Sequence, residues 1–312
     1  MKQYDIVYPL GSGSAWNDSE LRYSLRAIVK NLTGYRHIVI IGRLPDFIDP
    51  KTVIHIQADD PLPSNADGNI ALKVLKACAD KRVSDDFLFI NDDHIINKVM
   101  NVQDIGFYHK GDFAEFPVGF WHQGLHRQRL KRTFEILKKN GHTTFHFDIH
   151  TPIRINKKLF TDIVPSFDFK RDIGYTMKSI YANAAVPNEQ KENVGGLKTK
   201  LFKHKSLAVL QETFTRAHYV SYNDFGLNGA LKYHLAVTFP EISKYELYDK
   251  EKEAPEIIRE YLATQPDNYT KGVEIFSRFS KNATLKALFN RKCTNKTKEK
   301  LLYKLEVLAD AY

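Results

Sequence analysis

The chain has 312 residues, a formal net charge of +9, 43% hydrophobic residues and 27% charged residues. These values are typical of a soluble globular protein with one large or two smaller domains, and no apolar run of about eighteen residues occurs, which argues against a membrane-spanning helix. The two cysteines, Cys78 and Cys293, lack Cys-x-x-Cys spacing, which argues against a zinc finger or disulfide scaffold and favours a reducing, cytoplasmic location.

The first hundred residues alternate between short apolar strands and amphipathic helices. We expect strands over residues 4–8, 37–41, 52–56 and 87–90, and helices over residues 19–30 and 69–79. Alternating strands and helices of this length form a mostly parallel sheet with right-handed crossovers. The expected fold class is therefore α/β.

The sequence is less regular after residue 100 and becomes mainly helical beyond residue 155. An extended segment is expected over residues 144–148, and a mobile loop or lid over residues 187–200, where two glycines lie among charged residues. We divide the chain into an α/β domain over residues 1–250 and a helical C-terminal extension over residues 251–312. The expected helices cover residues 124–140, 157–163, 169–182, 228–239, 254–263, 269–279 and 296–309.

The apolar strand 87–90 ends abruptly in Asn91-Asp92-Asp93-His94. Two adjacent carboxylates at the end of a buried strand repel each other and are costly to desolvate. A divalent cation between them and an anionic ligand makes them favourable, and hard oxygen ligands suit Mg²⁺ or Mn²⁺. In open α/β sheets, ligands bind beyond the carboxyl ends of the strands. A solvated turn or a helix cap is the alternative interpretation.

Two further polar segments belong to the same region of the predicted sheet. Gly11-Ser12-Gly13 follows the first strand, and its small residues let backbone N–H groups approach an anion near a helix N-terminus. Asn69 and Lys73 are four residues apart and share one face of a helix. An ordinary strand-to-helix turn and a solvated lysine are the alternatives.

Ionisable side chains also cluster in the second half of the chain. Period two places His146, Asp148 and His150 on one side of an extended segment, where the carboxylate can orient an imidazole as a base or complete a metal site. The polar face of an edge strand is the alternative. Asp224 follows an aromatic run, although Asn-Asp is also a common turn sequence.

The excess positive charge is concentrated in two segments. Residues 127–139 include Arg127, Arg129 and Arg132, and residues 291–304 form the second concentration. Such segments suit a polyanionic partner such as nucleic acid, but a solvated helix face has the same composition.

Taken in order, these polar segments resemble the Stealth family of sugar-phosphate and sugar transferases over residues 4–247. The resemblance extends to all four sequence blocks of that family. The similar segments are Asp5-Ile6-Val7-Tyr8 with Glu20-Leu21-Arg22-Tyr23-Ser24-Leu25-Arg26; Asn69-Ile70-Ala71-Leu72 with Phe87-Leu88-Phe89-Ile90-Asn91-Asp92-Asp93; His150-Thr151-Pro152 with Lys157 or Lys158; and Tyr222-Asn223-Asp224 with Phe239-Pro240-Glu241-Ile242-Ser243-Lys244-Tyr245-Glu246.

The resemblance implies a Rossmann-like fold of the glycosyltransferase-A type, with helices on both faces of the sheet, and transfer from a nucleotide-sugar donor such as a UDP-sugar. The family's first block usually continues Thr-Trp-Val-Asp-Gly-Ser-Asp, whereas this chain has Pro9-Leu10-Gly11-Ser12-Gly13-Ser14. The early Asp is missing, so the nucleotide contacts or the donor type differ from those of the phosphotransferase members. The variant resembles glycosyltransferase-like members carried by bacteriophages and gut bacteria.

On this hypothesis the site residues take separate roles around a Mn²⁺ or Mg²⁺ ion. His150 is the expected general base, with Asp148 or Asp224 as the fallback, and Asp93 belongs both to the catalytic group and to the metal shell. The expected metal ligands are Asp92, Asp93 and His94. The expected donor-binding residues are Tyr8, Gly11, Ser12, Gly13, Asn69, Lys73, Asn91 and Arg154.

The sequence leaves the acceptor open. Arg127, Arg129 and Arg132 suit DNA, so a phage-type enzyme would glycosylate a hydroxymethylated base that is flipped out of the duplex. A capsular or wall polysaccharide is the second acceptor class. A non-enzymatic nucleic-acid-binding protein on a transferase scaffold is the third hypothesis, and the intact Asn-Asp-Asp sequence argues against it.

Overall fold

The computed structural model describes residues 3–14, 16–122, 124–247, 256–258, 260, 261 and 264. The chain divides into two units, Met1–Glu251 and Lys252–Tyr312, which are treated separately. The first unit contains the sheets and the site described below. The helix expected over residues 254–263 is described only at residues 256–258, 260 and 261, which are helical. The helices expected over residues 269–279 and 296–309, together with the basic segment 291–304, lie outside the described residues.

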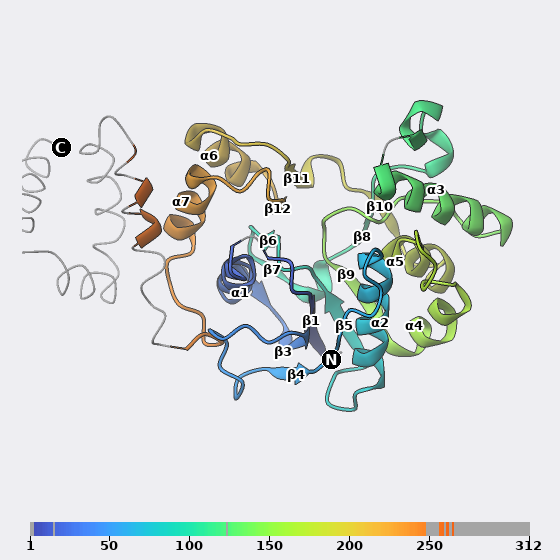
Figure 1. Cartoon of the computed structure of the whole chain (residues 1–312), viewed down its shortest axis with the longest axis horizontal. Helices are drawn as coiled ribbons and strands as arrows, with labels where there is room; N and C mark the ends of the chain where they lie inside the picture. The colour runs from blue at the N-terminus through green and yellow to red at the C-terminus, as the bar shows by residue number, and fades with distance from the viewer. Residues whose placement is uncertain are drawn as a thin grey trace, which may run out of the picture. The chain divides into compact units, whose positions relative to one another are not determined.

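A five-stranded sheet forms the centre of the first unit (Figure 1). Its strands β4, β3, β1 and β5 are parallel, and β9 runs antiparallel to β5. The strands lie in the order β4 (Ile54–Ile56), β3 (Tyr35–Gly42), β1 (Tyr4–Leu10), β5 (Asp86–Phe89) and β9 (Ile153–Asn156). The fold is therefore mixed α/β with a mostly parallel sheet, as the alternating sequence pattern predicts.

Helices α1 (Ser19–Asn31) and α2 (Ala66–Ala79) lie on opposite sides of β1 and β5 (Figure 1). The cause is the period-two alternation of β1, which places successive side chains on opposite faces of the sheet. Ile6 and Tyr8 belong to the apolar cluster that contains the α1 residues, whereas Val7 belongs to the cluster that contains the α2 residues. Both faces are apolar, as expected for buried parallel strands.

Smaller sheets extend the unit beyond the main sheet. Strand β12 (Tyr219–Tyr222) lies between β11 (Lys198–Leu201), to which it is parallel, and β6 (His94–Ile96), to which it is antiparallel. Parallel pairs join β8 (Phe107–His109) to β10 (Lys191–Asn193) and β2 (Leu32–Thr33) to β7 (Met100–Asn101). Within the mobile loop or lid expected over residues 187–200, residues 191–193 and 198–200 pair with strands distant in sequence, so part of this segment is strand.

The remaining helices include one that is much shorter than its sequence pattern predicts. The helix expected over residues 169–182 is wrong in its first half, because Phe169 and Tyr175 pack into the core and Gly174 has a left-handed φ of 64°. Only α5 (Met177–Ile180) and the π-helical turn Tyr181–Ala185 are helical there. The other α-helices are α3 (Gly124–Lys139), α4 (Lys157–Ile163), α6 (Leu207–Arg216) and α7 (Gly229–Thr238).

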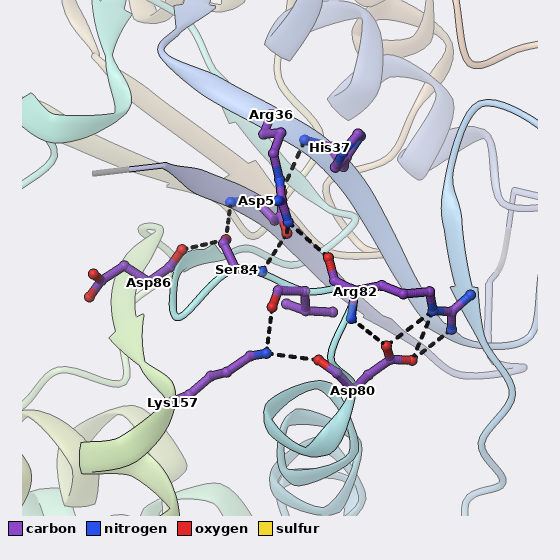
Figure 2. A network of polar contacts seen from close by, with 9 residues as sticks. Asp5, Arg36, His37, Asp80, Arg82, Ser84, Asp86 and Lys157 are labelled. Atoms are coloured by element: carbon purple, nitrogen blue, oxygen red, sulfur yellow. Dashed lines mark hydrogen bonds and ion pairs between the residues drawn. The ribbon is translucent and has the colours of Figure 1, made fainter. Parts of the chain in front are cut away.

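A polar network joins β1, β3 and the loop before β5 at the amino end of the sheet (Figure 2). The Asp5 carboxylate has no exposed surface. It accepts hydrogen bonds from the Arg36 guanidinium (3.0 and 2.8 Å) and from the backbone N–H groups of Ser84 (2.7 Å) and His37 (3.1 Å). Every acceptor direction of this buried carboxylate is therefore used within the protein.

Among the described residues, no helix combines the length and the apolar character that crossing a membrane requires.

Candidate functional site

Residues Asn91, Asp92 and Asp93 form the short turn between β5 and β6, beyond the carboxyl end of β5. Strand β1 lies between β3 and β5, so the chain winds outward from β1 first to one side of the sheet and then to the other. This reversal is a topological switch point, where open α/β sheets bind ligands. The acidic turn therefore lies where the sequence pattern predicts a site.

Asp93 lies between two imidazoles that come from different parts of the chain. Its Oδ1 is 3.4 Å from His94 Nε2, and its Oδ2 is 3.3 Å from His150 Nδ1. The two rings are 5.3 Å apart between centroids. One ligand atom from each residue lies within 4.8 Å of the others, a spacing that can hold a metal ion.

Helix α1 fixes the backbone at His94. The Ser24 hydroxyl donates to the His94 carbonyl at 2.7 Å, and the Tyr8 hydroxyl lies 2.8 Å from Ser24 Oγ. Tyr8 has no exposed surface. The structure thus places Tyr8, an expected donor-binding residue, behind the site, where it holds β6 in position.

The three-stranded sheet brings a lysine to the other side of His150. Strand pairing aligns Lys200 of β11 with Ser221 of β12, and Ser221 with His94 of β6. Lys200 Nζ contacts His150 Nε2. His150 therefore lies between the Asp93 carboxylate and the Lys200 ammonium, an arrangement that places the imidazole proton on Nδ1 when Lys200 is charged.

A small pocket opens beside these residues. A second lysine, the buried Lys178 of α5, borders it and donates to the carbonyl of Thr151 at 3.1 Å and to that of Ile149. Asp148 also borders it and lies 3.6 Å from the exposed His126, between Asp148 Oδ2 and His126 Nε2. The lining residues are Asp67, Ile70, Phe89, Asn91, His94, Asp148, Ile149, His150, Met177 and Lys178.

Burial and mutual charge shift the pKa values of the carboxylates in opposite directions. Burial, then the charges of Asp93 and Glu20, raise the pKa of Asp92 to about 7. Burial also opposes ionisation of Asp93, but His94 and His150 lower its pKa to about 2. Burial and the Asp148 charge raise the pKa of Asp67 to about 7. Asp93 therefore keeps its negative charge near neutral pH, and so does Asp148, because burial opposes its ionisation but His126 and Lys178 lower its pKa.

The nitrogen bases of the site are shifted toward their neutral forms. Burial lowers the pKa of His94, His150 and Lys200, and lowers that of His146 to about 4. Burial also lowers the pKa of Lys178 to about 8, although Asp148 opposes the shift. Neutral imidazoles can ligate a metal ion or accept a proton, which imidazolium ions cannot do.

Several buried oxygen and nitrogen atoms beside Asp93 have no hydrogen-bond partner, and their lone pairs can bind a cation. Asp93 Oδ1 and both ring nitrogens of His94 are buried and have no hydrogen-bond partner, and the same is true of Asn91 Oδ1. Two imidazoles and one carboxylate form a ligand set that divalent transition metals accept. Of the expected ligands, Asp93 and His94 belong to this group. Asp92 does not, and His150 takes the third place.

The residues expected to bind the donor occupy different positions around the sheet. Gly11, Ser12 and Gly13 are exposed after β1. Lys73 is buried beneath this turn, where Nζ donates to the Leu10 carbonyl at 2.5 Å and lies 2.6 Å from Asp60 Oδ1.

Asn69 is also largely buried, and its side chain bonds the backbone N–H and carbonyl of Leu62 at 3.0 and 2.9 Å. It therefore supports the loop before α2 and does not line the pocket. The Arg154 guanidinium carbon lies 5.4 Å from the centre of the Phe107 ring, and its buried Nε has no hydrogen-bond partner.

The remaining expected residues lie outside the pocket lining. Asp224 is exposed. Burial is the main cause that raises the pKa of Glu20; the Ser14 hydrogen bond opposes this shift, and the charges of Asp18 and Asp224 add to it. Arg127 and Arg132 are partly exposed. Arg129 is 8% exposed and bonds the Ile173 carbonyl and the Asp67 carboxylate, so its expected role as a nucleic-acid contact is wrong.

Sequence reasoning missed Asp67, Lys178 and Lys200. Asp67 lies two residues before Asn69, in the polar segment Ser64-Asn65-Ala66-Asp67-Gly68-Asn69. Lys178 lies between Met177 and Ser179 in a helix whose residues are all buried. The sequence signal that could have identified it is a single charged residue within an otherwise uncharged segment. Lys200 lies in the segment interpreted as a loop, and its position became informative only when β11 paired with β12.

No protein-family model matches the chain, and no curated protein matches it. The resemblance to the Stealth family stays a hypothesis that depends on the motifs quoted above.

Proposed function

We propose that this protein is a metal-dependent transferase that moves a sugar or a sugar-1-phosphate from a nucleotide-sugar donor, such as a UDP-sugar, to a hydroxyl acceptor. The observation that carries the proposal is the position of Asp93 between His94 and His150, beyond the carboxyl ends of the central parallel strands. A glycosyltransferase-A-type arrangement of the Rossmann-like class is part of the same proposal. The order of polar motifs along the chain supports it.

Asp93, His94 and His150 are the residues that would hold a divalent ion. Such an ion, Mn²⁺ or Mg²⁺, would act as a Lewis acid toward the charge of a leaving nucleoside diphosphate. The mixed nitrogen and oxygen ligand set suits Mn²⁺ better than Mg²⁺, because Mg²⁺ prefers oxygen ligands.

The protein's own residues account for substrate positioning and proton transfer. His150 is neutral near pH 7, because burial lowers its pKa, and it can accept the proton of an acceptor hydroxyl once Lys200 moves from Nε2. If His150 ligates the ion through one ring nitrogen, its other nitrogen carries the proton and cannot accept another, so the Asp148 carboxylate in the pocket lining is then the base. The exposed turn Gly11-Ser12-Gly13 would contact the donor phosphates through backbone N–H groups.

The proposal has two versions, which differ in the acceptor: a base in DNA or a polysaccharide. A hydroxymethylated base in phage DNA is favoured by the partly exposed Arg127 and Arg132, but the burial of Arg129 removes one of the three expected contacts. A capsular or wall polysaccharide requires no such contacts. A non-enzymatic nucleic-acid-binding protein is the alternative to both, and it assigns no role to the Asp93 group.

A donor screen tests the proposal. Purified protein is incubated with UDP-, GDP-, CMP- and ADP-sugars in Mn²⁺ or EDTA, and nucleotide release is followed with and without hydroxymethylated DNA or polysaccharide. We expect release with one donor, its loss in EDTA, and a fall of at least about a hundredfold in Asp93→Asn. Asp162→Asn, on the exposed surface of α4, is the matched control and should keep full activity.

Two results would contradict the proposal. If no donor is bound or turned over in either metal condition, the chain is not a nucleotide-sugar transferase. If Asp93→Asn turns over as fast as Asp162→Asn, the group around Asp93 has no part in the reaction.

A further inference from the structure

The 3₁₀ turn Val118–His122 and one face of α3 carry aromatic rings that the proposed transferase site does not use. The Phe120 and Trp121 rings lie 5.1 Å apart, and Trp121 stacks on Phe134 at 5.8 Å with an interplanar angle of 9°. These three side chains are partly exposed, and Val118 is 77% exposed. An uncovered apolar surface therefore lies beside α3, which Figure 1 shows at the edge of the unit, far from α1 in that view.

Positive charges border the same rings. Arg127, Lys131, Phe134 and Lys138 follow one another at intervals of three or four residues, so they share one face of α3. The Arg127 guanidinium carbon lies 4.5 Å from the centre of the Phe120 ring, and the Lys138 ammonium lies 5.8 Å from the centre of the Phe134 ring. Glu135 offsets part of this charge, since its carboxylate lies 3.9 Å from Lys131 Nζ.

We propose that this surface docks reversibly on an anionic lipid bilayer. It consists of Val118, Phe120, Trp121 and Phe134 with their basic border of Arg127, Lys131 and Lys138, and we call it the aromatic-basic surface. Tryptophan and phenylalanine rings are favourable at the boundary between headgroups and acyl chains, where basic side chains meet anionic headgroups. No spanning helix is needed for such binding.

Charge and apolar exposure together favour a bilayer over duplex DNA. Duplex DNA would neutralise the basic border but would leave Val118 and the aromatic rings in water, because no base is unstacked to cover them. An anionic bilayer provides both an apolar layer for the rings and negative headgroups for the lysines. An anionic lipid surface therefore matches both halves of the aromatic-basic surface, whereas duplex DNA matches only its basic half.

Vesicle sedimentation with the full-length protein tests this proposal. The vesicles contain phosphatidylcholine alone or an equal mixture of phosphatidylcholine and phosphatidylglycerol. We expect binding to the anionic vesicles only, weaker by about tenfold or more in Lys131→Glu/Lys138→Glu, because each basic residue near an anionic surface contributes about fivefold. Val118→Asp should weaken binding by about threefold or more, because it places a charge in the apolar layer.

Matched variants at equally exposed positions serve as controls. Val99 is 78% exposed and lies between β6 and β7, and the Lys158 side chain is 82% exposed on α4. Val99→Asp and Lys158→Glu should bind vesicles as the unmodified protein does. The chain has two tryptophans, so Trp121 can be observed alone in a Trp16→Phe background, where brominated acyl chains should quench its fluorescence.

Three outcomes would overturn the proposal. The first is no binding to anionic vesicles, and the second is equal loss of binding in the test and control variants. The third is binding of the same surface to random-sequence duplex DNA in the absence of vesicle binding. The donor screen is independent of all three, because vesicle binding is measured without a nucleotide sugar.

Discussion

The buried carboxylate of Asp5 offers the sharpest test of how the amino end of the sheet is held together. Asp5→Ala removes the acceptor that joins β1 to Arg36 and His37 of β3 and to Ser84 before β5 (Figure 2). The replacement leaves a small space and does not alter the direction of β1. The expected effect is therefore on the free energy of unfolding and not on the fold.

The structure sets the size of this effect. Two backbone N–H groups, of Ser84 and His37, lose their acceptor, and an unsatisfied buried donor costs about 1–3 kcal/mol. The Arg36 side chain is 35% exposed, so its guanidinium can turn toward water and adds less. We expect a loss of about 3–5 kcal/mol, which is the range for removing one partner of a buried ion pair.

Urea denaturation at pH 7 measures this loss, and Asp80→Ala is the matched control from the same network. Asp80 pairs with Arg82, whose side chain is 57% exposed, so its loss should cost about 1 kcal/mol or less. Hydrogen bonds from Arg36, Ser84 and His37 outweigh the effect of burial and lower the pKa of Asp5. The stability that Asp5 contributes is thus present above its unfolded pKa, near about 4, and is lost as the pH falls through the folded value.

The difference between the unmodified protein and Asp5→Ala should therefore shrink as the pH falls from 6 toward 3. Equal losses in Asp5→Ala and Asp80→Ala, or a difference that does not change with pH, would refute this account of the network.

Three further outcomes are expected from other parts of the fold. Glu246→Ala should lower the free energy of unfolding by about 3–5 kcal/mol in urea titration, because the buried carboxylate bonds Arg22 at 2.6 Å and Arg26 at 2.8 Å; a loss below about 1 kcal/mol would contradict this. Gly42→Ala should destabilise the protein by at least about 2 kcal/mol, because φ is 111° and the new Cβ would lie 2.1 Å from the Leu10 carbonyl oxygen; thermal melts that match the unmodified protein would show that β3 can shift. Mn²⁺ should raise the melting temperature in differential scanning fluorimetry, and Asp93→Asn should abolish the rise; an equal rise in that variant would place the bound ion elsewhere.

Local sequence patterns were sufficient for the α/β fold class. The strands expected over residues 4–8, 37–41 and 87–90 and the helices expected over residues 19–30 and 69–79 all occur, with ends that differ by a few residues. These segments are long and strongly periodic, and periodicity is a property of neighbouring residues. The expected helix over residues 169–182 was wrong because Phe169 and Tyr175 pack in the core from a loop, an outcome that local pattern does not encode.

The sequence by itself also determined where the candidate site begins, because carboxylates that directly follow an apolar strand lie at the carboxyl end of the sheet in any α/β fold. Only the tertiary structure decided which side chains meet there. Asp92 and Asp93 are adjacent in sequence, and the turn geometry directs only Asp93 to His94 and His150. Lys200 reaches His150 across 50 residues because strand register places β11 beside β12 and β12 beside β6. Register depends on contacts between distant segments, so the local sequence of β11, β12 and β6 does not determine which of their residues lie side by side.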